Sequence, residues 1–370
     1  MCGIIGIINL DRRPFSGEVI ARGLSHLKDR GNGLGSGYAG YGIYPDNADD
    51  WCFHIFFSSD DARLKTEARL DAAFKVVKKE PVPVKPLTSV KRPPVIWRYF
   101  LKIPALRSTT TGTLDEREKK YIFALVMEIN SSIEGAFVVS SGKNMGIFKG
   151  VGFPDEIAEF YRLNEYSATV WTAHNRFPTN TPGWWGGAHP FGIADLSLAH
   201  NGEISSFGIN KRYLESFGYH LALQTDSEAI LYLFDFLTRI HRLPVEIASA
   251  ALTPPHWDII DRMPSDEKKL FTALRMTYAS CLINGPSALL LGFEGGLMGL
   301  NDRIKLRPLV AAESRSYAYL SSEESAIASI ATEKLTKITH PPAGEPAIFR
   351  YRGDEKKNRH NEKNTKTPRV

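Results

Sequence analysis

Residues 1–8 have the sequence MCGIIGII, and this β-branched run predicts a buried strand at the start of the chain. Met1 is usually removed when the second residue is small, so we expect Cys2 to become the first residue. Its free α-amine would titrate at a pKa of roughly 7.7–8.0 and could serve as general base for the Cys2 thiol. The alternative is that Cys2 is a small buried residue opening a strand, and position alone favours this alternative.

Strands and helices alternate along the rest of the chain. Apolar residues that recur on one face predict helices over 16–28 and 225–239, and a Gly-rich loop is expected over 31–40. Strands are predicted from 135 to 200 and at 288–293, 309–312 and 317–320. Strand clusters separated by helices, with hairpin-like connections, predict an α/β sandwich of antiparallel sheets rather than a doubly wound parallel sheet.

Residues from about 47 to 130 have the pattern of an inserted subdomain. A strand over 51–57, a charged helix over 61–79, a strand over 95–100 and a helix over 115–129 are predicted, with a Pro-rich stretch in the middle. This β-α-β-α order suggests a small self-contained unit. Its charged helix faces could simply be solvated, or they could dock a partner protein.

Composition excludes several classes of protein. Of 370 residues, 43% are hydrophobic and 24% charged, as in soluble globular proteins. From Arg350 onward the chain has eight Lys or Arg residues and three Asp or Glu residues. This surplus of five positive charges equals the formal net charge of +5 for the whole chain. The body over 1–349 is therefore nearly neutral, which argues against nucleic-acid binding, and the basic tail over 350–370 is predicted to be disordered.

The three cysteines and the apolar runs predict a cytoplasmic protein. Cys2, Cys52 and Cys281 form no CxxC pair and are odd in number, which fits neither a disulfide framework nor a zinc site. No apolar run is long enough to span a membrane, and no signal peptide is evident.

Arg176 is the first candidate binding residue, within the sequence His174-Asn175-Arg176-Phe177-Pro178-Thr179-Asn180. Its planar, permanently charged guanidinium is suited to holding a carboxylate through two hydrogen bonds. A structural ion pair is the alternative, and it would be favoured if Arg176 stood alone.

Asn201 and Gly202 follow a predicted strand, in the sequence His200-Asn201-Gly202-Glu203-Ile204. Asn-Gly after such a run is typical of a tight hairpin turn. The functional alternative is an oxyanion hole, with the Asn201 amide and the Gly202 backbone N–H as donors. The two interpretations are compatible, because a tight turn can aim both donors.

Asp226 stands at the start of a predicted helix, in Gln224-Thr225-Asp226-Ser227-Glu228. Thr225 and Glu228 have the spacing of a capping box. That interpretation leaves Asp226 free to bind a cationic amine.

Taken together, these segments resemble the class II glutamine amidotransferases, a branch of the N-terminal-nucleophile hydrolases. The matching motifs, in the family's order, are Met1-Cys2-Gly3-Ile4-Ile5-Gly6, Arg30-Gly31, Arg176-Phe177-Pro178-Thr179-Asn180, His200-Asn201-Gly202-Glu203-Ile204 and Thr225-Asp226-Ser227-Glu228. They cover roughly 1–45 and 135–330. The Arg-Phe and His-Asn-Gly-Glu-Ile forms, and the segment from Asp302 to Leu309, are most similar to the amidotransferase domain of glutamate synthases.

The resemblance implies a four-layer αββα sandwich over residues 1–349, interrupted by the inserted subdomain. It also implies roles for the motif residues. Cys2 would attack the glutamine carboxamide, Asn201 and Gly202 would stabilise the oxyanion, and a γ-glutamyl thioester would form. Arg176 would bind the glutamine α-carboxylate and Asp226 its α-ammonium. Among the further substrate-site residues, Arg30 would help to order the site and Thr179 would line the pocket.

The resemblance further implies a synthase that uses the ammonia. Too few residues follow position 240 for such a module, so we expect a separate synthase subunit, of glutamate synthase or N-methylglutamate synthase type. FMN and an iron–sulfur cluster would belong to that subunit, and this chain would need no cofactor and no metal. The alternatives are a non-catalytic glutamine-sensing subunit and a hydrolase for another amide.

Two other patterns are set aside. Gly35 to Gly40 matches GxGxxG, but it follows a predicted helix where a dinucleotide fingerprint requires a strand. His174, His189 and His200 have no metal-ligand spacing, so each is interpreted as a structural histidine with satisfied hydrogen bonds.

Overall fold

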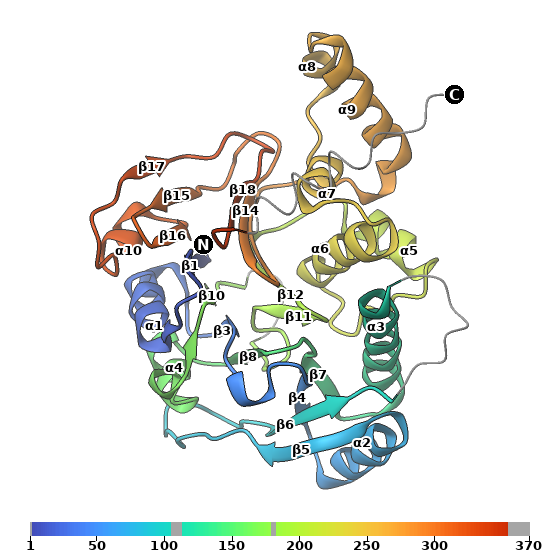
Figure 1. Cartoon of the computed structure of the whole chain (residues 1–370), viewed down its shortest axis with the longest axis vertical. Helices are drawn as coiled ribbons and strands as arrows, with labels where there is room; N and C mark the ends of the chain where they lie inside the picture. The colour runs from blue at the N-terminus through green and yellow to red at the C-terminus, as the bar shows by residue number, and fades with distance from the viewer. Residues whose placement is uncertain (1, 105–112, 179–182, 354–370) are drawn as a thin grey trace.

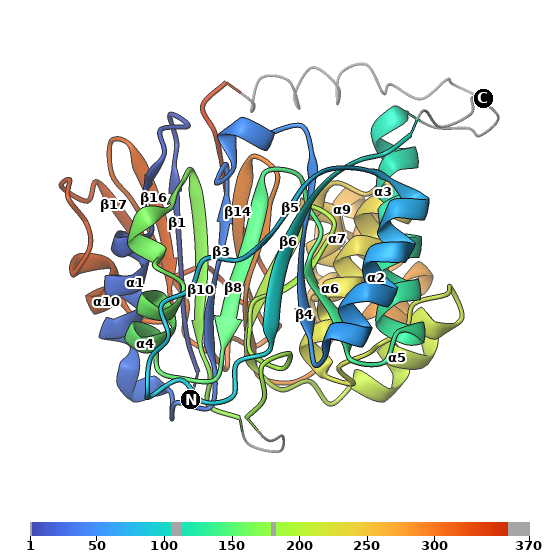
Figure 2. The same cartoon turned by 90° about the horizontal axis from the view of Figure 1, so that it is seen from below.

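In the computed structural model of the chain, residues 2–104, 113–178 and 183–353 are described. Two stacked antiparallel β-layers lie between two layers of helices (Figure 2). This confirms the expected αββα sandwich. No helix within the described ranges combines the length and the apolar character that crossing a lipid bilayer requires.

The first β-layer is a seven-stranded sheet with β1 near its centre (Figure 1). In spatial order its strands are β17 (Lys337–Thr339), β15 (Val310–Glu313), β16 (Tyr317–Ser321), β1 (Gly3–Asn9), β10 (Val170–Asn175), β3 (Ser36–Tyr41) and β8 (Met145–Gly150). Its outer face is covered by α1 (Gly17–His26), α4 (Pro154–Phe160) and α10 (Glu324–Ala328). A two-stranded ribbon, β2 (Phe15–Ser16) and β9 (Ser167–Ala168), flanks α1.

The second β-layer contains two sheets. One has the order β11 (Phe191–Ile193), β12 (Leu196–Gly202), β13 (Ser287–Phe293), β14 (Gly296–Asn301) and β18 (Ala347–Arg350). The other has the order β5 (Lys75–Pro81), β6 (Val95–Lys102), β4 (Trp51–Phe57) and β7 (Ala136–Ser140).

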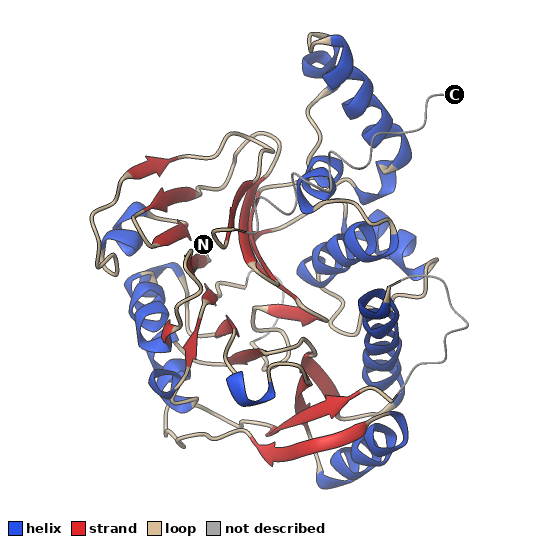
Figure 3. Ribbon diagram, viewed as in Figure 1, coloured by secondary structure: helices blue, strands red, loops and turns tan. Residues whose placement is uncertain are grey.

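The second helical layer covers both of these sheets. It contains α2 (Asp60–Ala73), α3 (Leu114–Ser132), α5 (Phe207–Glu215), α6 (Asp226–Asp235) and α7 (Val245–Leu252). Helices α8 (Trp257–Asp261) and α9 (Ser265–Thr277) form an arm that projects from the body (Figure 3). Short 3₁₀-helices and one π-helix complete the set: Lys28–Arg30, Pro45–Asn47, Leu163–Glu165, Ala279–Cys281 and the π-helix Phe236–Ile240.

Alternation along β13 shows how the layers are bound together. Leu290 packs into the core between the β-layers, whereas Leu289 and Leu291 pack into the core beneath the helices. Successive side chains on a strand point to opposite faces, so one strand joins both cores. Burying an aliphatic side chain of this size contributes about 1.5–3 kcal/mol relative to exposure.

The segment 47–130 is continuous with the sandwich, so it is not a separate unit. Strand β4 pairs with β7, which lies outside this segment. Phe53 and Phe56 of β4 belong to the two different cores. The predicted helix over 61–79 is also too long. It ends at Ala73, because Lys75–Pro81 pairs with β6 as strand β5.

Two further boundaries differ from the prediction. The Gly-rich stretch is not all loop, since Ser36–Tyr41 is the buried strand β3. Gly40 there allows close packing, because a Cβ would lie 2.8 Å from the Trp171 ring. The ordered chain also extends past 350: Tyr351 is buried, and Arg352 N donates to Leu10 O at 2.8 Å. The remainder of the predicted tail, from 354, lies outside the described residues.

Candidate active site

Cys2 lies at the start of β1, beside the end of the neighbouring strand β10. The register pairs Gly3 with Asn175, which brings Cys2 opposite Arg176. The Phe177 backbone N–H donates to Cys2 Sγ at 3.2 Å. Burial raises the pKa of the Cys2 thiol, although the Phe177 N–H and nearby positive charges act in the opposite direction. The thiol is therefore protonated at neutral pH, and it would need a base in order to act as a nucleophile.

Arg30 supports the Cys2 backbone. Its Nε donates to Cys2 O at 3.1 Å, and its other end forms an ion pair with Glu323 at 2.6 Å. Arg30 does not line the pocket that contains Cys2. Its contacts with Cys2 and Glu323 fit the ordering role expected from the sequence, and its place among the substrate-binding residues stays a prediction. Thr179, the other less specific candidate, lies outside the described residues.

Arg176 directly follows β10 and lines the same pocket as Cys2. Its backbone N–H donates to Gly35 O at 2.8 Å, and only 5% of the residue is exposed. Burial lowers the pKa of Arg176, while Cys2 and Asp226 raise it. A buried guanidinium interacts more strongly with an anionic ligand than an exposed one, because the surrounding protein screens the charges less than water does.

Asn201 and Gly202 are the last two residues of β12, paired with Ala288 and Ser287 of β13. The expected tight hairpin at this Asn-Gly pair is therefore wrong, since both residues continue an antiparallel ladder. Gly202 has φ +153°, and a Cβ there would collide with Pro286 O. Asn201 is 1% exposed, and its Nδ2 has no hydrogen-bond partner in the described part of the chain. A buried donor without a partner is costly, which points to a ligand or a water as its acceptor.

Asp226 begins α6 and is held in place by the adjoining strand end. Its Oδ2 accepts from the Ile204 backbone N–H at 3.1 Å, and its Oδ1 accepts from Ser227 Oγ at 3.2 Å. These bonds orient the carboxylate on the pocket wall. An anion at a helix N-terminus is also favoured by the helix dipole.

The capping box at α6 forms only in part. Thr225 Oγ1 accepts from Glu228 N at 3.2 Å, as predicted. The Glu228 carboxylate accepts instead from the Leu223 backbone N–H at 2.9 Å, so it holds the preceding loop. Burial raises the pKa of Glu228 to about 7, although the hydrogen bond from the Leu223 N–H acts to lower it.

The three histidines are buried together near the pocket. His174 Nε2 lies 3.0 Å from His200 O, and His200 Nδ1 lies 2.9 Å from Ser227 Oγ. His189 stacks on Phe191, and neither of its ring nitrogens has a partner among the described residues. Burial lowers the pKa of all three, that of His174 to about 3, so each imidazole is neutral. The prediction of satisfied hydrogen bonds is wrong for His189.

The pocket has a volume of about 230 Å³ and combines charged and apolar walls. It is lined by Cys2, Arg176, Phe177, Pro178, His189, His200, Gly202, Glu203, Ile204, Phe207, Gln224, Thr225, Asp226 and Ser227. Sequence reasoning did not assign Phe207 or Gln224 to a site. Phe207 reaches the pocket only because α5 follows β12, and no local motif signals that contact. Gln224 has φ +53°, a conformation that its position before the helix cap does not predict.

Comparisons with known proteins agree with this geometry. The family model "Glutamine amidotransferases class-II" matches residues 86–344. An uncharacterized protein of Archaeoglobus fulgidus is 48% identical over 358 residues, covering 96% of this chain and 93% of that protein. A putative glutamine amidotransferase of Methanothermobacter thermautotrophicus is 24% identical over 328 residues, covering 88% and 92%. The glutamate synthase [NADPH] large chain of Bacillus subtilis is 28% identical over 289 residues, covering 69% of this chain and 18% of that protein.

The chain belongs to the class II glutamine amidotransferases, because the family model matches more than half of it. It is thus an amidotransferase enzyme, and glutamine fits as its substrate. Cys2 lies outside the matched range, in the pocket that Arg176 and Asp226 also line.

Proposed function

We propose that this chain hydrolyses L-glutamine to glutamate and ammonia, with Cys2 as the nucleophile. The observation that carries the proposal is the pocket itself, where the Cys2 thiol, a buried cation and an oriented carboxylate face one space. An α-amino acid carries one anionic and one cationic group. Arg176 therefore binds the α-carboxylate of glutamine, and Asp226 binds the α-ammonium. With both charged groups of the α-carbon held, the side-chain amide at the other end of glutamine extends toward Cys2.

The proposed reaction begins with removal of Met1. The α-amine of Cys2 takes the thiol proton, and Sγ attacks the carboxamide carbon to form a tetrahedral intermediate. The unpartnered Asn201 amide and the Gly202 N–H stabilise its oxyanion. The C–N bond breaks as the amine returns the proton to the leaving group, which departs as ammonia. Water then hydrolyses the γ-glutamyl thioester, releasing glutamate and the free thiol.

We further propose that the ammonia passes to a separate synthase subunit of glutamate synthase type, one that carries FMN and an iron–sulfur cluster. Similarity to the large chain of a glutamate synthase supports this choice. An N-methylglutamate synthase is the related alternative. Co-purification with candidate synthase proteins would test it, and a chain that stays alone with every candidate would contradict it.

The glutaminase proposal is tested by incubating the purified chain with glutamine, with and without synthase candidates. Wild-type protein should release glutamate, and Cys2→Ala should not. Equal glutamate release by the two proteins, or none by either, would contradict the proposal. A glutamine-sensing subunit, the second candidate, would bind glutamine without turnover. A hydrolase for another amide would act on substrates that lack a free amino-acid end.

A further inference from the structure

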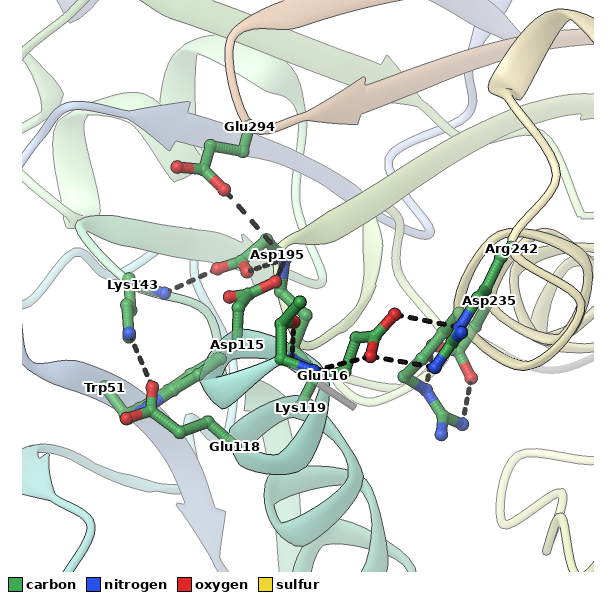
Figure 4. Close-up of polar contacts among 12 residues, drawn as sticks. Trp51, Asp115, Glu116, Glu118, Lys119, Lys143, Asp195, Asp235, Arg242 and Glu294 are labelled. Carbon is green, nitrogen blue, oxygen red and sulfur yellow. Dashed lines mark hydrogen bonds and ion pairs between the residues drawn. The ribbon is translucent and has the colours of Figure 1, made fainter. Parts of the chain in front are cut away.

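A second cavity, of about 490 Å³, shares no lining residue with the pocket around Cys2, and its charged groups pair with one another. Lys119 Nζ, for example, lies 3.0 Å from Asp115 Oδ2 and 3.2 Å from Asp195 Oδ2 (Figure 4). None of the residues that line this cavity, all of which are described, has a buried side-chain nitrogen or oxygen without a hydrogen-bond partner. The pocket around Cys2 differs, because His200 lines it and has such an atom, Nε2.

Alternation along β12 directs the His200 side chain toward α6. Ala199 belongs to the core between the β-layers, whereas Leu198 belongs to the core beneath the helices. Side chains two residues apart on a strand lie on the same face, so His200 faces the helical layer together with Leu198. There it contacts the first turn of α6, which contains Asp226 and Ser227.

His200 is connected to Asp226 through Ser227 and not directly. His200 Nδ1 lies 3.8 Å from Asp226 Oδ1, which is too far for a hydrogen bond. The Ser227 hydroxyl bridges the two: its Oγ lies 2.9 Å from His200 Nδ1 and donates to Asp226 Oδ1 at 3.2 Å. The three side chains therefore form a chain of hydrogen bonds that ends at the carboxylate proposed to bind the α-ammonium of glutamine.

The direction of this chain indicates which nitrogen of His200 carries the proton. A carboxylate only accepts hydrogen bonds, and a serine hydroxyl has one proton to donate. Because Ser227 donates that proton to Asp226, Ser227 accepts from His200, and Nδ1 is therefore protonated. Burial lowers the pKa of His200, although Asp226 acts to raise it, so the imidazole is neutral. The other tautomer would bury an N–H at Nε2, which has no acceptor in the described part of the chain.

This arrangement determines how the Asp226 carboxylate is held. Its Oδ2 accepts from the Ile204 backbone N–H and its Oδ1 from Ser227, so the two donors together set the plane of the carboxylate. A serine in the first turn of a helix can otherwise turn its hydroxyl to a nearby backbone group. With the Nδ1–H of His200 on one side of Ser227 Oγ, the hydroxyl proton is kept on the other side, toward Asp226.

We propose that His200 is a positioning residue for glutamine, which acts through Ser227 to hold the Asp226 carboxylate in the orientation that binds the α-ammonium. The inference rests on the proposed glutaminase function and adds His200 and Ser227 to the binding of the amino-acid end of the substrate. In this role His200 does not touch the reacting carboxamide. Its loss should therefore weaken glutamine binding and leave the chemical step at Cys2 nearly unchanged.

The test is L-glutamine binding by the full chain in a Cys2→Ala background, where glutamine cannot react, measured by isothermal titration calorimetry. His200→Asn places an amide N–H near the position of Nδ1, whereas His200→Gln places its amide near the position of Nε2. We expect His200→Gln to weaken glutamine binding about five- to tenfold, as the loss of one orienting hydrogen bond would, and His200→Asn to stay within about twofold of the background. With Cys2 intact, His200→Gln should raise KM by a similar factor and keep kcat within about threefold.

Further variants separate positioning from general damage to the fold. Ser227→Ala should weaken binding as much as His200→Gln, and the double variant no more than either, because both residues act through one contact. His54→Phe is the control for losing a buried imidazole, since His54 bonds to Tyr44 Oη and Ile147 O and does not line the pocket. It should lower the Tm and leave glutamine affinity unchanged. Unchanged affinity in His200→Gln or Ser227→Ala, equal losses in both His200 variants, additive losses in the double variant, or a loss in His54→Phe would each overturn the proposal.

The tautomer of His200 is measured without any substrate. Long-range nitrogen–proton correlation spectra of the histidine-labelled chain, assigned by the signals that His200→Asn removes, should show a neutral ring protonated at Nδ1. A ring protonated at Nε2, or at both nitrogens, would overturn the inference whether or not glutamine is hydrolysed. Glutamine binding that depends on His200, without glutamate release by the wild-type chain, would contradict the proposed function alone. Absent glutamine binding would overturn both.

Discussion

The unpartnered amide of Asn201 leads to a prediction that separates activity from stability. Asn201→Ala removes a donor that, in the described part of the chain, bonds to nothing in the resting protein. If the amide serves the oxyanion, its loss should lower kcat and leave KM almost unchanged, because the oxyanion exists only during the reaction. Replacing a purely structural asparagine would instead lower the free energy of unfolding and leave kcat almost unchanged.

The structure sets the expected magnitudes. Loss of one oxyanion-hole donor costs about 2.7–4 kcal/mol of transition-state stabilisation, a fall in kcat of about a hundred- to a thousandfold. The free energy of unfolding should change by less than about 1 kcal/mol, since no hydrogen bond from Nδ2 is lost. The control is Asn175→Ala. Asn175 is equally buried, but its Nδ2 donates to Leu27 O at 2.8 Å and Lys28 O at 3.0 Å.

Losing those two bonds should lower the unfolding free energy of Asn175→Ala by about 1–3 kcal/mol. The assays are glutamate release under steady-state conditions and urea unfolding followed by circular dichroism. The reasoning would be refuted if Asn201→Ala kept kcat within tenfold of wild type. It would also be refuted if Asn201→Ala lost as much stability as Asn175→Ala.

Three further predictions follow from the same site. Arg176→Lys should raise the KM for glutamine about ten- to a hundredfold, since a lysine cannot form the two-pronged carboxylate contact; an unchanged KM in glutaminase assays would argue against that contact. Burial raises the pKa of Glu228 to about 7 from 4.5, so the folded protein holds a proton that the unfolded chain releases. Stability from this group is fully present below pH 4.5 and is lost as the pH rises through 7, by roughly 3 kcal/mol; urea unfolding at several pH values should show this slope, and Glu228→Gln should flatten it. Gly202→Ala should destabilise the fold and abolish activity, because a Cβ collides with Pro286 O; a stable, active variant in thermal melts and assays would contradict this.

Much of the fold could be predicted because local patterns were strong. The strand over 51–57 and the helix over 115–129 agree with β4 and α3, where aromatic residues and periodic apolar residues, respectively, are frequent. The failures lie where long-range packing decides the structure. Ser36–Tyr41 forms a strand because its glycines fit beneath bulky neighbours, and Lys75–Pro81 does so because it pairs with β6.

The candidate residues could be chosen from sequence, but their assembly could not. Cys2 and Arg176 meet only because β1 and β10 pair in one particular register. The Asp226 carboxylate is oriented in the pocket by a hydrogen bond from the Ile204 N–H, and this bond joins the start of α6 to the chain that follows β12. The burial that makes Glu228 titrate near neutrality is also invisible in sequence, where the residue has the pattern of an ordinary cap.

The central claim is that Cys2, as the first residue of the mature chain, attacks glutamine. The direct measurement is mass spectrometry of the protein after treatment with a diazoketone analogue of glutamine, with digestion to locate the adduct. Cys52 and Cys281 are buried and serve as internal controls. The account predicts one adduct, on Cys2, in a peptide that lacks Met1, with labelling slowed by glutamine. An adduct elsewhere, no adduct, or an active chain that retains Met1 would contradict it.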